Sequence, residues 1–182
     1  MDAPASIADL EEVLQAPKRL EGSLAWRPQH PGGKVKARGA RLNLVATLDA
    51  GGVTLEGVDF FAAVTASEPD RKVAMQLRVL YGGKYRPFTR VDWRGSPHTN
   101  MKHPESPLHL KSLGETHIHR LRDNAFLGWP DIAATADDLP VADATPELAD
   151  FSALITYIAE EFAIENANEI REPPWEPLLS NP

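Results

Sequence analysis

Residues 41–93 alternate between apolar and polar side chains, in runs separated by short turns. The period of two recurs over 41–48, 72–81 and 85–93, and it places alternate side chains on opposite faces of a strand. The turns Asp49–Gly52 and Gly82–Gly83 are too short for the crossover that parallel strands need. The segment therefore predicts an antiparallel meander.

Other runs extend this predicted sheet. Residues 53–66 supply either one further strand or a pair of strands broken at Gly57, and 21–27 form another. Pro87 cannot donate a ladder hydrogen bond, so it indicates an edge or a bulge near the start of its strand. The predicted meander has about five to six strands.

Two segments have the 3–4 residue apolar spacing of amphipathic helices. Residues 6–14 begin with Ser6, a suitable N-cap, and end before Pro17. Residues 150–166 carry one wide apolar stripe, which requires a partner surface. We therefore predict an α+β fold in which the meander packs on a C-terminal amphipathic helix, with a short N-terminal helix. Residues 1–170 form one domain, and 171–182 form a Pro-rich C-terminal tail.

Composition excludes several kinds of protein. The 182 residues are 42% hydrophobic and 25% charged, as in a globular protein. There is no cysteine, which excludes disulfides, thiolate metal sites and cysteine nucleophiles. No apolar run approaches the ~20 residues of a membrane span, and the acidic N-terminus lacks a signal-peptide core. We expect a cytoplasmic protein that is not bound to a membrane.

Charge is distributed unevenly along the chain. Residues 71–122 contain eleven Lys and Arg and three acids, a net charge of +8. Because the whole chain carries −7, the remainder carries −15. The basic segment can form an anion-binding face, or its cations can pair with acidic neighbours.

Five of the six histidines lie within 89–122, so this segment holds the candidate chemistry. His117 and His119 are two residues apart on a predicted strand and share a face, about 7 Å apart at Cα. His98, in the preceding loop, can close over the same face. Three imidazoles that converge can ligate zinc or another divalent metal, so His98, His117 and His119 are the candidate ligands.

The same histidines can also act without a metal. Metal-independent RNA cleavage needs one neutral and one protonated imidazole, together with a cation for the phosphate. His98, His117 and His119 are the candidate catalytic residues. The candidate substrate-binding cations are Arg94, Lys111 and Arg120.

Structural alternatives exist for each of these residues. His98 can hold a turn, the His-x-His pair can be a polar face that touches acids, and His103 and His109 fit a surface loop. Asn100 is typical of a turn. Asp92 can orient a histidine or pair with a neighbouring arginine.

Three motifs in order carry a resemblance to a family. They are Arg90-Val91-Asp92, the loop Gly95-Ser96-Pro97-His98-Thr99-Asn100, and His117-Ile118-His119-Arg120. The chain resembles a family of uncharacterised bacterial and prophage-associated proteins with a Pro-His-x-Asn loop, a His-x-His strand and a following basic residue. The insertion 101–114 departs from that pattern and puts His103 and His109 in doubt as site residues.

The resemblance and the histidines imply three hypotheses from different classes. The first is a histidine-based nucleic-acid hydrolase or ribonuclease, similar in style to toxins of toxin–antitoxin modules, with RNA as its partner. The second is a non-enzymatic mobile-element protein that inhibits a host defence complex through its acidic surface. The third is a structural metal-binding domain, with zinc as the expected ion.

Overall fold

A computed structural model describes residues 6–29, 41–128, 132 and 139–175. The predicted α+β class is confirmed, because an antiparallel sheet packs against a C-terminal helix and a short N-terminal helix. The main sheet has eight strands, more than predicted. Four of the strands have only two or three residues each. The strand at His117–His119 was predicted, whereas the predicted strand 21–27 is instead two short strands, Arg19–Glu21 and Arg27–Pro28.

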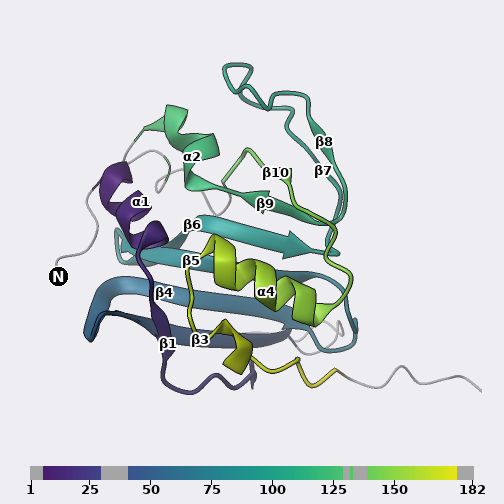
Figure 1. The fold of residues 1–182 in the computed structure, drawn as a ribbon. Helices are drawn as coiled ribbons and strands as arrows, with labels where there is room; N and C mark the ends of the chain where they lie inside the picture. The colour runs from purple at the N-terminus through teal and green to yellow at the C-terminus, as the bar shows by residue number, and fades with distance from the viewer. Residues whose placement is uncertain (1–5, 30–40, 129–131, 133–138, 176–182) are drawn as a thin grey trace, which may run out of the picture.

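The four long strands follow one another in the chain and in the sheet. Strand order is β1-β3-β4-β5-β6-β9-β10, and β2 also pairs with β3. The strands are β1 (Arg19–Glu21), β2 (Arg27–Pro28), β3 (Arg41–Ala50), β4 (Val53–Thr65), β5 (Val73–Tyr81), β6 (Lys84–Trp93), β9 (His117–His119) and β10 (Asp143–Ala144). A separate hairpin joins β7 (His98–Thr99) to β8 (Ser112–Leu113). In Figure 1 this hairpin rises beyond the β9 edge of the sheet.

Local sequence signals act where they were expected. Gly82 and Gly83, with φ of 58° and 76°, make the tight β5–β6 turn, a left-handed conformation that glycine adopts at low cost. The β5–β6 register shifts between Leu77 and Arg78, because Arg78 pairs with Pro87 and Phe88 has no partner. The bulge predicted from Pro87 is therefore confirmed.

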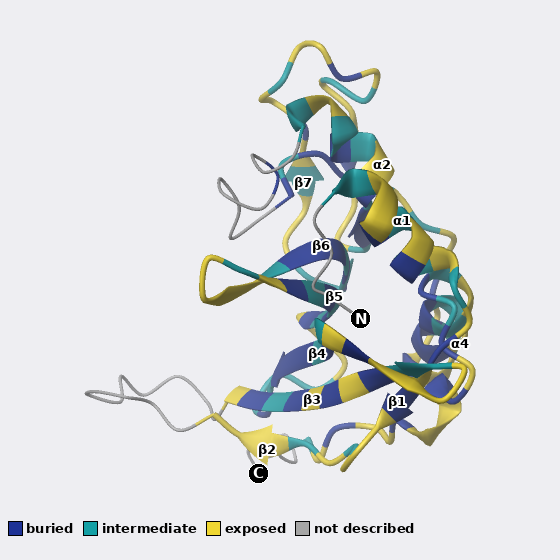
Figure 2. Ribbon diagram, turned by 90° about the vertical axis from the view of Figure 1, so that its left-hand side faces the viewer, coloured by how far each residue is buried: buried dark blue, intermediate teal, exposed yellow. Residues whose placement is uncertain are grey.

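Helices cover one face of the sheet. They are α1 (Ile7–Gln15), α2 (Leu121–Asn124), η1 (Ala125–Leu127), α4 (Phe151–Glu161) and η2 (Ala167–Glu169). Ser6 caps α1 by accepting from the Asp9 amide at 3.1 Å, as predicted, and Asp150 caps α4 by accepting from Ala153 at 2.8 Å. Figure 2 shows α1 and α4 on the same side of the sheet.

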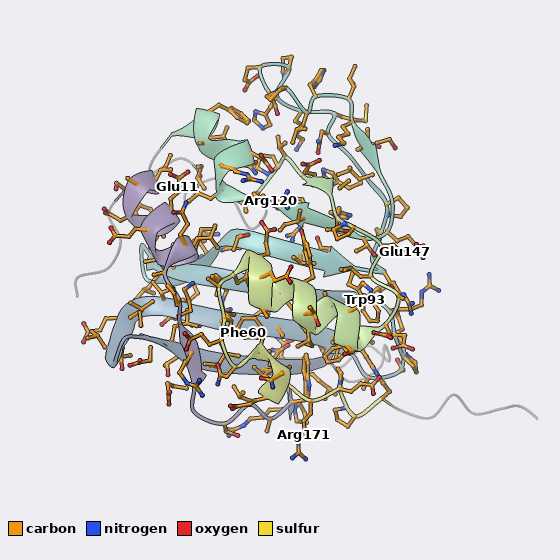
Figure 3. The ribbon with its side chains drawn as sticks, in the orientation of Figure 1. Glu11, Phe60, Trp93, Arg120, Glu147 and Arg171 are labelled. Atoms are coloured by element: carbon orange, nitrogen blue, oxygen red, sulfur yellow. The ribbon has the colours of Figure 1, made fainter. Side chains whose placement is uncertain are left out.

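The core fills the layer between α4 and the sheet. Trp93 is fully buried and meets Phe151 of α4 edge to face, with ring centroids 6.4 Å apart. Figure 3 labels Trp93 and Phe60 where α4 crosses the sheet. The side chains of β3 alternate as predicted, with Leu42, Leu44, Ala46 and Leu48 buried. The other side chains of β3, which include Arg41, Asn43 and Val45, face the opposite side of the sheet, where the histidines lie.

Lys18 connects the two ends of the chain. Its buried ammonium donates to the carbonyls of Leu14 and Phe162, at the C-terminal ends of α1 and α4, at 3.0 and 2.6 Å. The C-terminal end of a helix carries partial negative charge and unpaired carbonyls, so it suits a cation. Burial nevertheless lowers the pKa of Lys18 to about 8.

Residues 139–144 are held in place, although the Pro/Asp/Ala-rich composition of residues 123–147 predicts an ordered loop followed by a flexible acidic one. Asn124 accepts from the Val141 amide and donates to the Val141 carbonyl, both at 2.9 Å. Asn100 does the same with Ala142, at 3.0 and 2.8 Å. Each side-chain amide pairs with one peptide group as a neighbouring strand would. The expected flexibility is therefore wrong for this part of the loop.

The tail begins in contact with the domain. Trp26 donates its indole N–H to the Arg171 carbonyl at 2.8 Å, and Trp175 packs against the core. Within the described parts of the chain, no helix has the length and apolar character to cross a membrane.

Candidate functional site

Three histidines converge at the β9 edge of the sheet, as the sequence predicted. The ring centroids of His98 and His117 are 5.4 Å apart, and His119 lies 5.2 Å from each of them. One ring nitrogen of each residue lies within 4.8 Å of the others. Strand β9 positions two of them on one face, and β7 brings the third over that face. The three lie close enough to bind one metal ion.

Hydrogen bonds fix which ring nitrogens are available. The Nδ1 atoms of His117 and His119 contact the carbonyls of Gly114 and Leu139, at 3.1 and 2.6 Å. Because a carbonyl only accepts, both Nδ1 atoms carry the proton. His98 donates from Nε2 to the Asn100 side-chain oxygen at 2.9 Å, since that amide gives its N–H groups to two carbonyls. The nitrogens left for a ligand are His98 Nδ1 and Nε2 of His117 and His119.

Asp92 and Arg90 complete the site from the neighbouring strand β6. Asp92 pairs in register with His117, and Arg90 with His119. The Asp92 carboxylate lies 3.4 Å from His117 Nε2 and 3.5 Å from His119 Nε2. Arg90 donates to the same carboxylate at 2.9 Å and approaches His119 Nε2 at 3.0 Å. The Arg90 guanidinium therefore lies beside two acceptors, the Asp92 carboxylate and His119 Nε2.

Burial and these contacts set the charge states. Burial lowers the pKa of His119 below its ordinary value, and the charge of Arg90 lowers it further, against the hydrogen bond to Asp92. His119 is thus neutral at pH 7, as a metal ligand must be. Burial alone would raise the pKa of Asp92, but contacts with His117 and His119, which would donate to it if protonated, and the charge of Arg90 hold that pKa far below its usual range.

Two cavities flank the His98 ring. The first, of about 500 Å³, lies on the open sheet face and is lined by Arg41, Phe61, Lys72, Val73, Ala74, Gln76, Arg90, Asp92, Gly95, Ser96, Pro97, His98 and His117. The second, of about 610 Å³, lies toward the β7–β8 hairpin and includes His119, Met101 and Lys102. His98 and Arg90 line both cavities. A ligand can therefore reach His98 and Arg90 from either side.

The structure does not bring the three predicted substrate-binding cations to the histidines. Arg120 binds Glu161 through two hydrogen bonds of 2.5 and 3.0 Å, and Figure 3 labels it on the side of α4. Arg94 donates to the Ala149 carbonyl, and Lys111 pairs with Asp143. None of these cations lines either cavity beside the histidines.

Most of the cations within residues 71–122 pair with acids. Seven of its eleven cations form ion pairs with acids: Arg71, Lys72, Arg78, Arg90, Lys111, Arg120 and Arg122. Segment 71–122 therefore does not present its full charge of +8 on one face.

The other singled-out residues occupy structural positions. His103 contacts Glu105 at 3.1 Å and packs on Phe126, and it lines only the second cavity. His109 is partly buried in the same loop. His30 and Trp129 lie outside the described residues.

Three residues that matter for the site were not among the predicted site residues. Arg90 and Asp92 share a face because they are two apart on a strand, a signal present in the sequence. Asn100 was interpreted as a turn residue, yet its buried amide orients His98 and binds Ala142. Contacts of this kind join distant parts of the chain, so no local pattern reveals them.

Comparison of the chain with family models, with curated proteins and with solved structures finds no match. The family resemblance based on the histidine motifs therefore stays a prediction.

Proposed function

We propose that the protein is a hydrolase that uses a divalent metal ion, with His98, His117 and His119 as the ligands. One observation carries the proposal: one ring nitrogen of each of three histidines lies within 4.8 Å of the others, and each ring also has a nitrogen held by a carbonyl or amide oxygen. Metal-binding histidines characteristically have such an outer partner, which sets the tautomer and the ring orientation.

The distances within the site support this assignment. Zinc–nitrogen bonds of ~2.0–2.1 Å imply roughly 3.3–3.4 Å between neighbouring ligand atoms of a tetrahedron. The three histidine nitrogens lie within 4.8 Å of one another, at most about 1.4 Å wider than that spacing. The Asp92 oxygen lies beside them, 3.4 and 3.5 Å from Nε2 of His117 and His119. Two unprotonated nitrogens and a carboxylate repel one another unless a cation lies between them. In the metal-free site, Arg90 supplies that charge.

The residues have separate roles in this proposal. The three imidazoles hold the metal, which supplies Lewis acidity when bound. Asp92 remains ionised and can orient water or accept its proton. Arg90 leaves its position beside His119 and turns toward the first cavity, where its charge faces the substrate.

Metal-free cleavage of RNA is the second candidate, and the Arg90 contact favours it. His119 accepts from Arg90 and is neutral, whereas a protonated His117 would donate to Asp92. One neutral and one charged imidazole are what that chemistry needs. However, His117 and His119 are only 3% and 1% exposed, which separates them from a substrate. Metal ligation does not require exposure, so it is the first choice.

Metal analysis tests the proposal directly. Purified protein should retain about one divalent ion per chain, and His117→Ala should lose it. The loss should exceed the roughly 10–100-fold cost of removing an outer-shell partner. His109→Ala is a matched control, because His109 lies outside the triad. Phosphodiester hydrolysis should disappear on chelation and return with metal.

Other outcomes select the alternatives. Hydrolysis that survives chelation indicates metal-free cleavage. Bound metal without hydrolysis, together with unfolding on chelation, indicates the structural metal-binding domain. Absence of both metal and hydrolysis leaves the acidic partner-binding protein as the remaining hypothesis.

A further inference from the structure

The open face of the sheet forms a shallow floor beside the histidines. Ala63 of β4 pairs with Ala74 of β5, which pairs with Asp92 of β6, and Asp92 pairs with His117. The side chains of the two alanines are small, so this cross-strand row rises less far above the sheet than the row next to it. That next row runs through Phe61, Gln76, Arg90 and His119. The first cavity lies over these two rows.

Cations stand at both ends of this cavity. Arg41 and Lys72 line one end. Arg41 lies four residues along β3 from Val45, the partner of Phe61 in the row of Arg90, and Lys72 directly precedes β5. Four residues of an antiparallel strand span about 13 Å. Among the lining residues there are three cations and one acid, Asp92, which already faces the histidines. The cavity is therefore complementary to an anion that is longer than one charged group.

Pairing within the protein leaves part of this charge available. Lys72 forms an ion pair with Glu68 at 2.8 Å, but both side chains are well exposed, and such pairs are weak. Arg41 has no ion pair among the described residues and is exposed at the start of β3. Phe61 and Gln76 add a ring and an amide between the two ends. These groups suit a base and a sugar placed between two phosphates.

We propose that this cavity binds single-stranded nucleic acid, with one phosphate at Arg41 and Lys72 and another beside Arg90 and the histidines. The proposal rests on the proposed function, because it places the second phosphodiester at the metal centre. It names the substrate class of that site. It also replaces Arg94, Lys111 and Arg120 as the substrate-binding cations.

A binding titration can test the proposal separately from catalysis. The probe is a fluorescent 2′-O-methyl RNA of roughly ten nucleotides, which cannot be cleaved through its 2′-hydroxyl and covers a typical single-strand site. Fluorescence anisotropy at about 50 and 200 mM salt gives the affinity and its salt slope, which should be ~−0.7 for each phosphate contact. Arg41→Gln should weaken binding about fivefold and make the slope shallower by ~0.7.

Two further variants control for unfolding and for overall charge. Gln76→Glu changes one atom on the cavity floor and adds a negative charge there, so it should weaken binding at least as much as Arg41→Gln. Arg122→Gln removes the same charge from α2, outside the cavity, and should leave the affinity unchanged. Thermal melts of the variants should match that of the parent protein.

Each outcome bears on one proposal. No binding at 50 mM salt, equal binding of poly-glutamate, or equal effects of Arg122→Gln and Arg41→Gln would overturn the nucleic-acid site. If the protein holds metal but the strand does not bind, only this inference fails. If the strand binds as predicted but the triad holds no metal, the cavity assignment stands and the metal-dependent hydrolase fails.

Discussion

Replacing Asn100 with alanine should destabilise the protein and weaken the metal site together. The Asn100 side chain is 1% exposed and makes four hydrogen bonds of 2.8–3.0 Å. Its partners are the Ala142 amide and carbonyl, the Leu108 carbonyl and His98. In the variant all four partners lose this bond, and two of them belong to Ala142, which is fully buried.

The expected cost follows from those two buried groups. Each buried polar group without a partner costs about 1–3 kcal/mol, whereas Leu108 and His98 are partly exposed and can bind water. We therefore expect the free energy of unfolding to fall by roughly 2–6 kcal/mol, a large part of the ~5–15 kcal/mol of a typical domain. Urea unfolding measures this change, and zinc titration should show a 10–100-fold weaker site, because His98 loses the partner that orients it.

Thr99→Ala is the matched control for Asn100→Ala. Thr99 is exposed in the same short strand, and its hydroxyl contacts Ser112 at the long distance of 3.4 Å. It should cost less than about 0.5 kcal/mol. If Asn100→Ala costs less than about 1 kcal/mol of unfolding free energy, or if zinc affinity is unchanged, Asn100 does not hold His98 and Ala142 in place as its contacts indicate.

Three other predictions concern charged side chains. The Arg90→Gln variant should bind zinc about tenfold more tightly in calorimetry, because the substitution removes a cation from beside Asp92 and His119. Weaker binding would contradict this role of Arg90. The pKa of Lys18 is about 8 in the folded protein and 10.5 ordinarily. Between pH 8 and 10.5 the unfolded chain therefore binds more protons than the folded protein, so the free energy of unfolding should rise with pH in this range. Relative to Lys18→Met, the parent should gain about 2 kcal/mol in urea unfolding between pH 7.5 and 10, and an equal difference at both pH values would exclude the shift. Arg120→Gln should cost roughly 2–3 kcal/mol of stability through the lost Glu161 pair, yet leave nucleic-acid affinity unchanged, and reduced affinity would restore Arg120 to the binding site.

The sequence predicts the meander and both principal helices well because their signals are local. A period of two identifies the long strands, and Pro87 identifies the bulge in β6. Ser6 marks the start of α1, and residue 150, where the predicted stripe begins, is the N-cap of α4. The predicted end at 166 is wrong, because α4 ends at Glu161. Strands β9 and β10 have three and two residues, so their places in the sheet depend on partners that the local pattern does not contain.

The two-residue period of a strand already places Arg120 on the face opposite His117 and His119. The choice of Arg120 as a candidate site residue did not apply this rule. His117 and His119 face the open side of the sheet, and Ile118 faces the core. Position 120 follows Ile118 by two residues, so its side chain belongs on the α4 side, where it binds Glu161. A basic residue adjacent to a histidine in sequence is therefore a poor choice for a shared site on a strand. Arg90 is the better choice by the same rule, because its register on β6 places it beside His119 on the open face of the sheet.

The outer layer of the site lies beyond any local pattern. Asn100 and Asn124 reach Ala142 and Val141, partners 42 and 17 residues away, and both use an amide to imitate a strand. Through these two peptide groups the segment is fixed so that the Leu139 carbonyl meets His119 Nδ1 at 2.6 Å. An asparagine in a loop is typical of a turn, and only the folded chain shows that this one has a buried partner. The tautomer of His119, and with it the direction of its free nitrogen, therefore depends on a segment that the sequence analysis treated as flexible.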